Sequence, residues 1–260
     1  MSRSVRRAVL ALNLRRRSLR FAACVVCLME YLINGWFGAL ALLADMDDAT
    51  LSAIHATLVS TLYAMTAAFL LGLVPGFILG YCDFPGRRAL RLVSDTLLAF
   101  PTVLIGLIVY AFITARGPLG QYELLFTLPG MAIGQAVLAL PIVVSWTAQA
   151  VENLDSRCRE TLLTLGANAR QTALLTLWEC RFAIGMVCVT AFGRVITEVG
   201  VAMMLGGNIR YSTRTMTTAI ALETSKGDFS QGIALGLVLL FMAFLVNLAL
   251  AFLRRRGARA

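Results

Sequence analysis

Residues 159–172 read RETLLTLGANARQT and lie between two of the most apolar regions of the chain. The stretch alternates polar and aliphatic residues, breaks at Gly166 and restarts at Asn168. Glycine can adopt a left-handed backbone that ends a helix, and asparagine is a suitable N-cap for the next one. We therefore predict a short helical hairpin here. It is either an element that inserts its leucines into a partner's groove or an ordinary connecting loop.

The regions around the hairpin have the composition of a membrane protein. Of the 260 residues, 59% are hydrophobic and 14% are charged, whereas a soluble domain carries about 25% charged residues. Four runs without formal charge are each long enough for the roughly 20 residues that span a bilayer as a helix: 49–82, 96–115, 124–151 and 229–253. Two further runs are 21–44, which contains Glu30, and 182–205, which contains Arg194 and Glu198. The chain is thus predicted to be an all-α, polytopic transmembrane bundle with five core spans and an extra N-terminal span.

Arginine placement predicts the orientation, because basic residues concentrate in cytoplasmic loops. Three arginines lie in 81–93 and four in 254–260, so both segments are expected in the cytoplasm. Alternation of the spans then places 115–123 and 206–228 outside and 152–180 inside.

The N-terminus holds seven arginines within residues 1–20. If 21–44 is an extra span, these residues form a basic cytoplasmic tail, which is the arrangement we prefer. Alternatively, translation begins at Met29 and the segment is a short interfacial helix. A cleaved signal peptide is a third option, although no convincing cleavage site follows the apolar core.

Several functional classes are disfavoured. The net charge of +9 comes from clusters flanking apolar runs, so no nucleic-acid partner is expected. Cys24 and Cys27 form a CxxC pair inside an apolar run and are interpreted as small buried hydrophobic residues. His55 is the single histidine and no phosphate-binding GxxxxGK[ST] loop occurs. We therefore expect no catalytic residue, metal site or cofactor in this chain, and if the protein uses ATP, another subunit binds it.

The hairpin resembles the EAA loop of ABC-transporter permease subunits. Glu160 and Gly166 match that loop's glutamate and glycine, while Thr161 and Leu162 occupy the positions of its two alanines. The resemblance implies that these four residues, with Arg170, form a coupling element that docks on the ATPase.

Further stretches resemble permeases of the tungstate importer group over about residues 34–253. They are FPGRR (84–88), SDTLLAFPTVLIGLIVYAFITARGPLG (94–120), AIGQAVLALPI (132–142) and FGRVITEVGVAMMLGGNIRYSTRTMTTAIALETSKGDF (192–229).

This resemblance implies a bacterial cytoplasmic (inner) membrane protein with the ABC importer permease fold. Its transmembrane domain would be 49–253, with a cytoplasmic coupling loop at 152–180 and a basic cytoplasmic tail at 254–260. The implied partners are a second copy in a homodimer, two cytoplasmic ATPase subunits, an extracytoplasmic oxyanion-binding protein and membrane lipid. Molybdate or sulfate as the substrate, and a non-transport membrane scaffold, remain alternatives.

Two groups of residues are candidates for the translocation path. Arg194 and Glu198 are four residues apart and are expected on one helix face, as a gate-supporting pair or a structural bridge. The segment 206–228 offers neutral donors that suit a gate for an oxyanion: Asn208, Ser212, Thr213, Thr215, Thr217 and Thr218. Arg210 and Arg214 are expected to dock the binding protein or attract the anion, unless they are ordinary loop charges. Met203, Met204 and Leu205 form either a hydrophobic constriction or simple packing.

Overall fold

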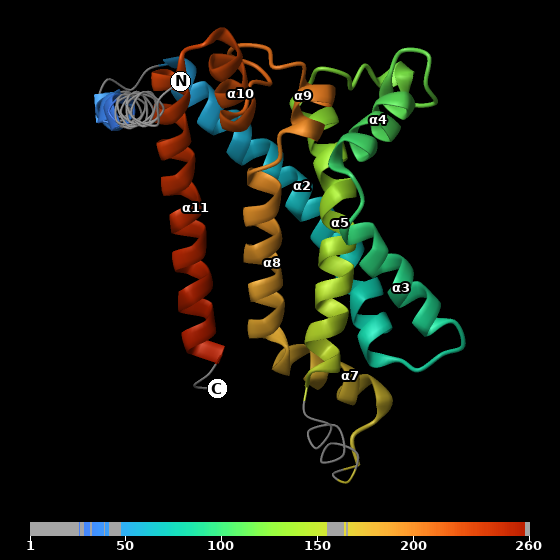
Figure 1. Cartoon of the computed structure of the whole chain (residues 1–260). Coiled ribbons are helices and arrows are strands. Elements are labelled where there is room, and N and C mark those ends of the chain that lie inside the picture. Colours follow the sequence, from blue (N-terminus) through green and yellow to red (C-terminus); the bar gives the residue numbers. More distant parts are fainter. Residues whose placement is uncertain are drawn as a thin grey trace, which may run out of the picture.

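The computed structural model describes residues 26, 29–31, 33–38, 40–41, 48–154, 164 and 166–257. Every regular element in these ranges is a helix, as predicted (Figure 1). The tail 1–20, most of segment 21–44, and the predicted coupling residues Glu160, Thr161 and Leu162 lie outside the described residues.

The helices are labelled in chain order. They are α2 (Asp48–Tyr81), α3 (Arg87–Leu98), α4 (Thr102–Ile113), the 3-10 helix η1 (Gly120–Tyr122), α5 (Leu128–Glu152), α7 (Ala169–Glu179), α8 (Arg181–Ile196), α9 (Gly200–Gly206), α10 (Met216–Lys226) and α11 (Phe229–Gly257).

Three of these helices, α2, α5 and α11, are long and apolar enough to cross a membrane. Two pairs meet the same criterion jointly but are bent, α3 with α4 by 99° and α7 with α8 by 54°. If each bent pair counts as one span, the described residues hold five, in line with the five core spans predicted.

The bends correct two of the sequence expectations. A single spanning helix was expected over 96–115, but α3 and α4 are separated by an extended backbone at Pro101. Proline has no N–H to continue a helix and disfavours helical backbone in the residue before it, so the chain turns here. The run 182–205 is also broken, since α8 ends at Ile196 and α9 begins at Gly200.

The connecting segments alternate between two ends of the bundle (Figure 1). The α9 end contains α9, α10, the first turn of α2 and residues 114–127; the α7 end contains α7, residues 82–86 and the last turns of α11. The Phe126 N–H donates to the Leu205 carbonyl at 2.9 Å at the α9 end. The predicted alternation is therefore present, and which end faces the cytoplasm stays a prediction.

Glycines allow α2 and α5 to pack closely. A Cβ on Gly76 would lie 2.8 Å from the Val144 carbonyl oxygen, and one on Gly80 would lie 2.5 Å from the Ala148 carbonyl oxygen. Small residues of this kind permit close helix approach in membranes. In the same way, a Cβ on Gly134 would meet the Leu205 side chain at 2.2 Å. Glycines thus allow α2 to pack closely on α5, and α9 to pack closely on α5 at Gly134.

Candidate functional site

The short helix α9 lies between α4 and α5 and carries the three residues considered as a constriction. Leu205 is fully buried against α5, whereas Met203 is 40% exposed. Met204 packs against α4, where a Cβ on Gly106 would lie 2.9 Å from its Sδ. Leu205 therefore belongs to the core, and the two methionines are the residues of α9 that remain nearer the surface.

Two consecutive residues in the left-handed region end α9. Gly207 has φ 66° and Asn208 has φ 53°. Glycine has no Cβ to oppose this backbone, and asparagine tolerates it better than most residues. The GGN sequence therefore turns the chain abruptly into the loop that leads to α10.

Four threonine side chains of the 206–228 segment are buried inside the subunit: Thr213, Thr215, Thr217 and Thr218. Thr215 and Thr218 form a capping box at the start of α10, and the Thr217 hydroxyl donates to the Glu198 carbonyl at 3.0 Å. The buried Thr213 hydroxyl donates to the Gly206 carbonyl. The structure thus places these hydroxyls as internal braces of the α9–α10 connection.

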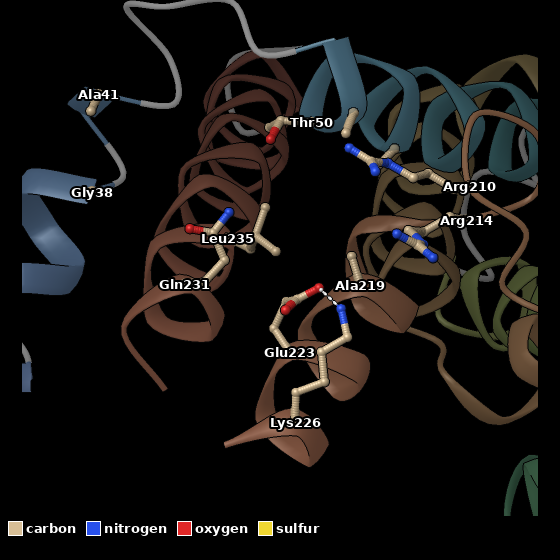
Figure 2. A pocket seen from close by; sticks show the side chains of 12 residues that line it. Gly38, Ala41, Thr50, Arg210, Arg214, Ala219, Glu223, Lys226, Gln231 and Leu235 are labelled. Carbon is tan, nitrogen blue, oxygen red and sulfur yellow. Dashed lines mark hydrogen bonds and ion pairs between the residues drawn. The ribbon is translucent and has the colours of Figure 1, made fainter. Parts of the chain in front are cut away.

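A cavity of about 720 Å³ opens beside α10 at the α9 end (Figure 2). Arg210 and Arg214 line it from the loop after α9, and Glu223 and Lys226 line it from α10. The Arg214 Nε donates to the Asn208 Oδ1 at 3.1 Å. The structure therefore brings both predicted arginines and Asn208 together at this end.

Glu198 connects three helices. Its Oε1 accepts the N–H of Gly200 at 2.9 Å and that of Val201 at 3.4 Å, both at the start of α9. Its Oε2 accepts a hydrogen bond from Arg194 at 3.2 Å, and its backbone carbonyl receives the Thr217 hydroxyl. The Arg194–Glu198 pair forms, but the expectation that both residues share one helix face is wrong, because α8 ends at Ile196.

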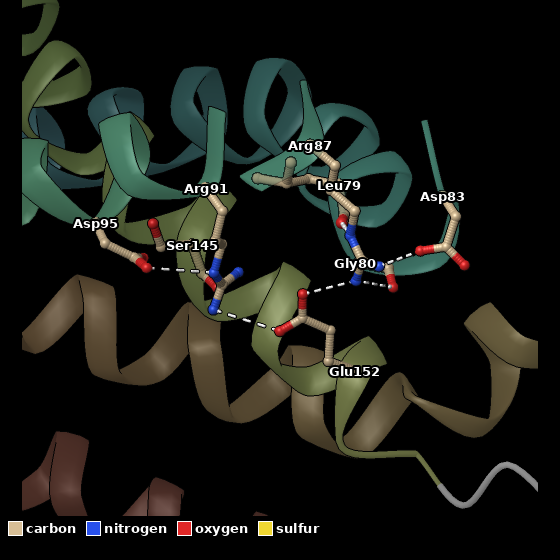
Figure 3. A network of polar contacts seen from close by, with 8 residues as sticks. All are labelled: Leu79, Gly80, Asp83, Arg87, Arg91, Asp95, Ser145 and Glu152. Atoms are coloured by element: carbon tan, nitrogen blue, oxygen red, sulfur yellow. Dashed lines mark hydrogen bonds and ion pairs between the residues drawn. The ribbon is translucent and has the colours of Figure 1, made fainter. Parts of the chain in front are cut away.

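A network of charges holds the base of α5 at the α7 end (Figure 3). Glu152, the last residue of α5, accepts a hydrogen bond from Arg87 at 2.9 Å and lies 3.7 Å from Arg91. Arg87 also donates to the Leu79 carbonyl at the end of α2, at 2.9 Å, and Arg91 donates to the Ser145 carbonyl at 2.9 Å. The amphipathic helix α3 is thereby fixed to the point from which the 152–180 segment departs.

The second half of the predicted hairpin has the expected local structure. Gly166 adopts a left-handed backbone with φ 79°. Asn168 caps α7 and forms a capping box with Gln171. Both local predictions are confirmed. Arg170 is exposed on the first turn of α7, and the apolar side chain of Trp178 is 66% exposed further along it.

Residues 68–259 match the family model of binding-protein-dependent transport system inner membrane components. The chain belongs to this family. It is thus the inner-membrane permease component of an ABC importer and not its ATPase, and membership implies ATPase and binding-protein partners.

Two curated relatives match most of this permease's length. The tungstate uptake system permease protein TupB of Campylobacter jejuni is 44% identical over 227 residues, which cover 87% of this chain and 95% of the relative. The protein of the same name from Peptoclostridium acidaminophilum is 36% identical over 219 residues, covering 84% and 96%. A chain of the MetNI methionine ABC transporter, solved in inward-facing conformations, superposes with a TM-score of 0.65 at 16% identity. That match covers 82% of this permease and 98% of the MetNI chain and supports the fold.

The sequence reasoning missed two features of this permease. Arg87 and Arg91 were used to predict orientation, but their shared partner Glu152 is 65 residues away from Arg87 along the chain and no local pattern indicates it. The hydrogen bonds that the Glu198 side chain accepts from Gly200 and Val201 were also missed, because glutamate is not a typical N-cap residue and the local sequence gives no signal for them. Among the described residues, no three histidine, cysteine, aspartate or glutamate side chains gather where a metal ion could bind.

Proposed function

We propose that this permease carries tungstate across the membrane by alternating access. The observation that supports tungstate most strongly is the 44% identity to the Campylobacter jejuni tungstate uptake permease across 95% of its length. The complex we propose contains two copies of this chain, two ATPase subunits that bind ATP and Mg, and one external oxyanion-binding protein.

The coupling role falls to the segment between α5 and α8. We propose that Glu160, Thr161, Leu162, Gly166 and Arg170 contact the ATPase. Support comes from the left-handed Gly166, the capped start of α7 and the exposed Arg170. The charge network of Glu152 with α3 gives the segment a fixed starting point, so motion of the segment is passed to α5 and α8.

The gate lies at the α9 end in this proposal. Met204 closes the path as part of α9, and Arg194 and Glu198 support that helix from the end of α8. Asn208, Thr215, Thr217 and Thr218 brace the turn between α9 and α10. The three threonines are buried and hydrogen-bonded around Thr215, and Asn208 accepts a hydrogen bond from Arg214. Arg210 and Arg214 lie where the binding protein has to deliver its cargo, and their charges suit contact with that protein or with the anion.

Uptake measurements on the reconstituted complex test the substrate. The permease, its ATPase and its binding protein are placed in proteoliposomes, and ATP-dependent accumulation of tungstate, molybdate and sulfate is compared. We expect tungstate to accumulate and unlabelled molybdate to compete with it, because the two dianions have the same charge and shape. Accumulation of sulfate that excess tungstate does not inhibit would overturn the proposal.

Gly166 provides the test of coupling. Gly166→Ala places a Cβ at φ 79°, which costs about 1 kcal/mol of backbone strain. We expect the variant to insert normally but to lose most stimulation of ATP hydrolysis by the loaded binding protein. Gly86→Ala is the matched control, since Gly86 has φ 94° and, like Gly166, has no atom within 4 Å of the position that the added methyl group would take. Equal stimulation in both variants contradicts the coupling role.

A further inference from the structure

The cavity at the α9 end combines three positive side chains in one recess. Its walls come from Gly38 and Ala41, the first turns of α2, the loop after α9, α10 and the start of α11. Figure 2 shows the side chains of Arg210, Arg214, Glu223 and Lys226 gathered around the same space, with Gln231 across from them on α11. The lining is mixed: its polar members Thr50, Arg210, Arg214, Glu223, Lys226 and Gln231 lie among small and apolar residues such as Ala53 and Leu235.

The charges that line the cavity do not cancel. Arg210, Arg214 and Lys226 contribute three positive charges and Glu223 one negative charge, which leaves a net charge of +2. Lys226 is paired with Glu223 at 2.9 Å. Neither arginine has a carboxylate within 4.0 Å among the residues that the structure describes.

Both arginines are oriented without being neutralised. Arg214 donates from Nε to the Asn208 side chain and from a terminal nitrogen to the Asn208 carbonyl, at 3.1 and 3.4 Å. Arg210 lies over the Tyr211 ring, with 4.8 Å from its central carbon to the ring centroid. A guanidinium has five N–H donors, so each arginine keeps several for a ligand.

The start of α2 contributes the positive end of a helix dipole, which the acidic Asp48 in the same turn offsets in part. Ala49 and Thr50, in the first turn of this 34-residue helix, line the cavity. The first turn of a helix carries backbone N–H groups and the positive end of the helix dipole, both of which favour an anion.

We propose that this cavity is a binding site for a tetrahedral oxyanion dianion, which it receives from the binding protein before the gate opens. The proposal rests on the proposed function for the identity of the anion as tungstate. The net charge of the lining matches the two negative charges of the anion, and charge-assisted hydrogen bonds from arginine suit its oxygens.

Glu223 has a defined part in the site. It holds Lys226 in place and lowers the net positive charge of the lining from +3 to +2, so it limits the affinity and favours release. Replacing Lys226 and replacing Glu223 therefore change anion binding in opposite directions, which a purely structural ion pair would not do.

Equilibrium dialysis of the purified transporter complex, without its binding protein, tests the site. Bound tungstate is measured as tungsten by mass spectrometry for the wild type, Arg214→Gln, Lys226→Gln and Glu223→Gln. A unit charge a few ångströms from a dianion in a water-like dielectric changes affinity by about tenfold. We expect Lys226→Gln and Arg214→Gln to weaken binding by at least about this factor and Glu223→Gln to strengthen it. Arg116→Gln, at an exposed arginine on the loop at the same end, is the matched control and leaves binding unchanged.

Binding of a second ligand separates the effect of the anion's charge from the effect of its size. Perrhenate is a tetrahedral monoanion similar in size to tungstate, and we expect it to bind at least about tenfold more weakly. Equal binding of the two anions overturns the proposal, and so does tungstate binding that Lys226→Gln and Glu223→Gln leave unchanged.

Three other outcomes distinguish this site from the proposed function. If the complete system imports tungstate but the complex alone retains none, the site is absent and the proposed function stands. If the arginine and lysine variants lose only their association with the binding protein, the cavity is a protein-docking surface and the oxyanion site is refuted. If the complete system imports sulfate and not tungstate, the proposed function fails, and sulfate then replaces tungstate as the probe of the same variants.

Discussion

Replacing Glu198 by alanine is expected to destabilise the permease far more than replacing its partner Arg194. The Glu198 side chain is 5% exposed and accepts three hydrogen bonds, two from backbone N–H groups that start α9 and one from Arg194. Arg194, in contrast, has a side chain that is 48% exposed. The two halves of one ion pair therefore lie in different surroundings.

The expected change in the free energy of unfolding follows from these contacts. A hydrogen bond to a charged group contributes about 1.5–3 kcal/mol, and losing a helix-capping acceptor costs about 1 kcal/mol. Because the two terms describe the same carboxylate, we expect Glu198→Ala to lower the free energy of unfolding by about 2–3 kcal/mol. An ion pair with a half-exposed arginine contributes less than about 1 kcal/mol, so Arg194→Ala should cost no more than that.

Unfolding of the purified permease in mixed detergent micelles, followed by tryptophan fluorescence, measures both variants. Glu198→Gln is the informative intermediate, since it keeps an oxygen for the α9 N–H groups and removes the charge. We expect its free energy of unfolding to lie between those of the wild type and Glu198→Ala. Equal losses for Arg194→Ala and Glu198→Ala would show that the ion pair, not the capping of α9, carries the stability, and would refute the reasoning.

Three further predictions test the helix contacts near the proposed gate and the proposed coupling segment. Gly80→Ala should lower the free energy of unfolding by about 1–3 kcal/mol, because its Cβ would lie 2.5 Å from a backbone oxygen of α5. The control Gly236→Ala, which has open space at the Cβ, should be neutral or stabilising. Equal changes in the two variants contradict the close packing of α2 on α5. Asn168→Ala removes the capping box of α7 and should lower the stability of that helix by about 1 kcal/mol, seen as faster amide hydrogen exchange confined to its first turn. Unchanged exchange in that turn argues against the cap. Glu152→Gln should release Arg87 and Arg91 and speed amide hydrogen exchange throughout α3. Glu179→Gln, which removes an exposed ion pair 4.0 Å long, should leave exchange in α3 unchanged. If both variants behave alike, the charge network does not hold α3.

Composition and local rules predicted the parts of this fold that depend on local properties. Runs of apolar residues long enough for a bilayer located α2, α5 and α11, because in lipid a backbone must satisfy its own hydrogen bonds as a helix. Gly166 and Asn168 were also predicted correctly, since left-handed backbones and N-caps depend on one or two residues.

The bends and the polar contacts could not be predicted in the same way. Hydropathy records how apolar a run is but not its direction. A kink could be expected at Pro101 from the proline, but neither the 99° size of that bend nor the break before Gly200, in a run that also contains Arg194 and Glu198, follows from hydropathy. The hydroxyls of Thr215 and Thr217 were expected at a gate because of their chemistry. Their burial depends on α10 folding back against α2 and α11, which no pattern within the 206–228 segment indicates.

The broken spans bring together backbone groups that continuous helices would have kept apart. Because α8 ends at Ile196, the Glu198 carbonyl is free to accept the Thr217 hydroxyl of α10. The N–H of Met216 in turn donates to the Thr57 hydroxyl of α2 at 2.9 Å. We infer that α8, α9, α10 and the first turns of α2 move together when α8 moves. Separating the end of α8 from α9 or α10, or α10 from α2, would leave a buried polar group unpaired at a cost of about 1–3 kcal/mol. A displacement that begins at α7 and passes through the 54° bend into α8 would therefore shift the whole α9–α10 unit, and with it both Met204, the proposed gate residue, and the basic cavity.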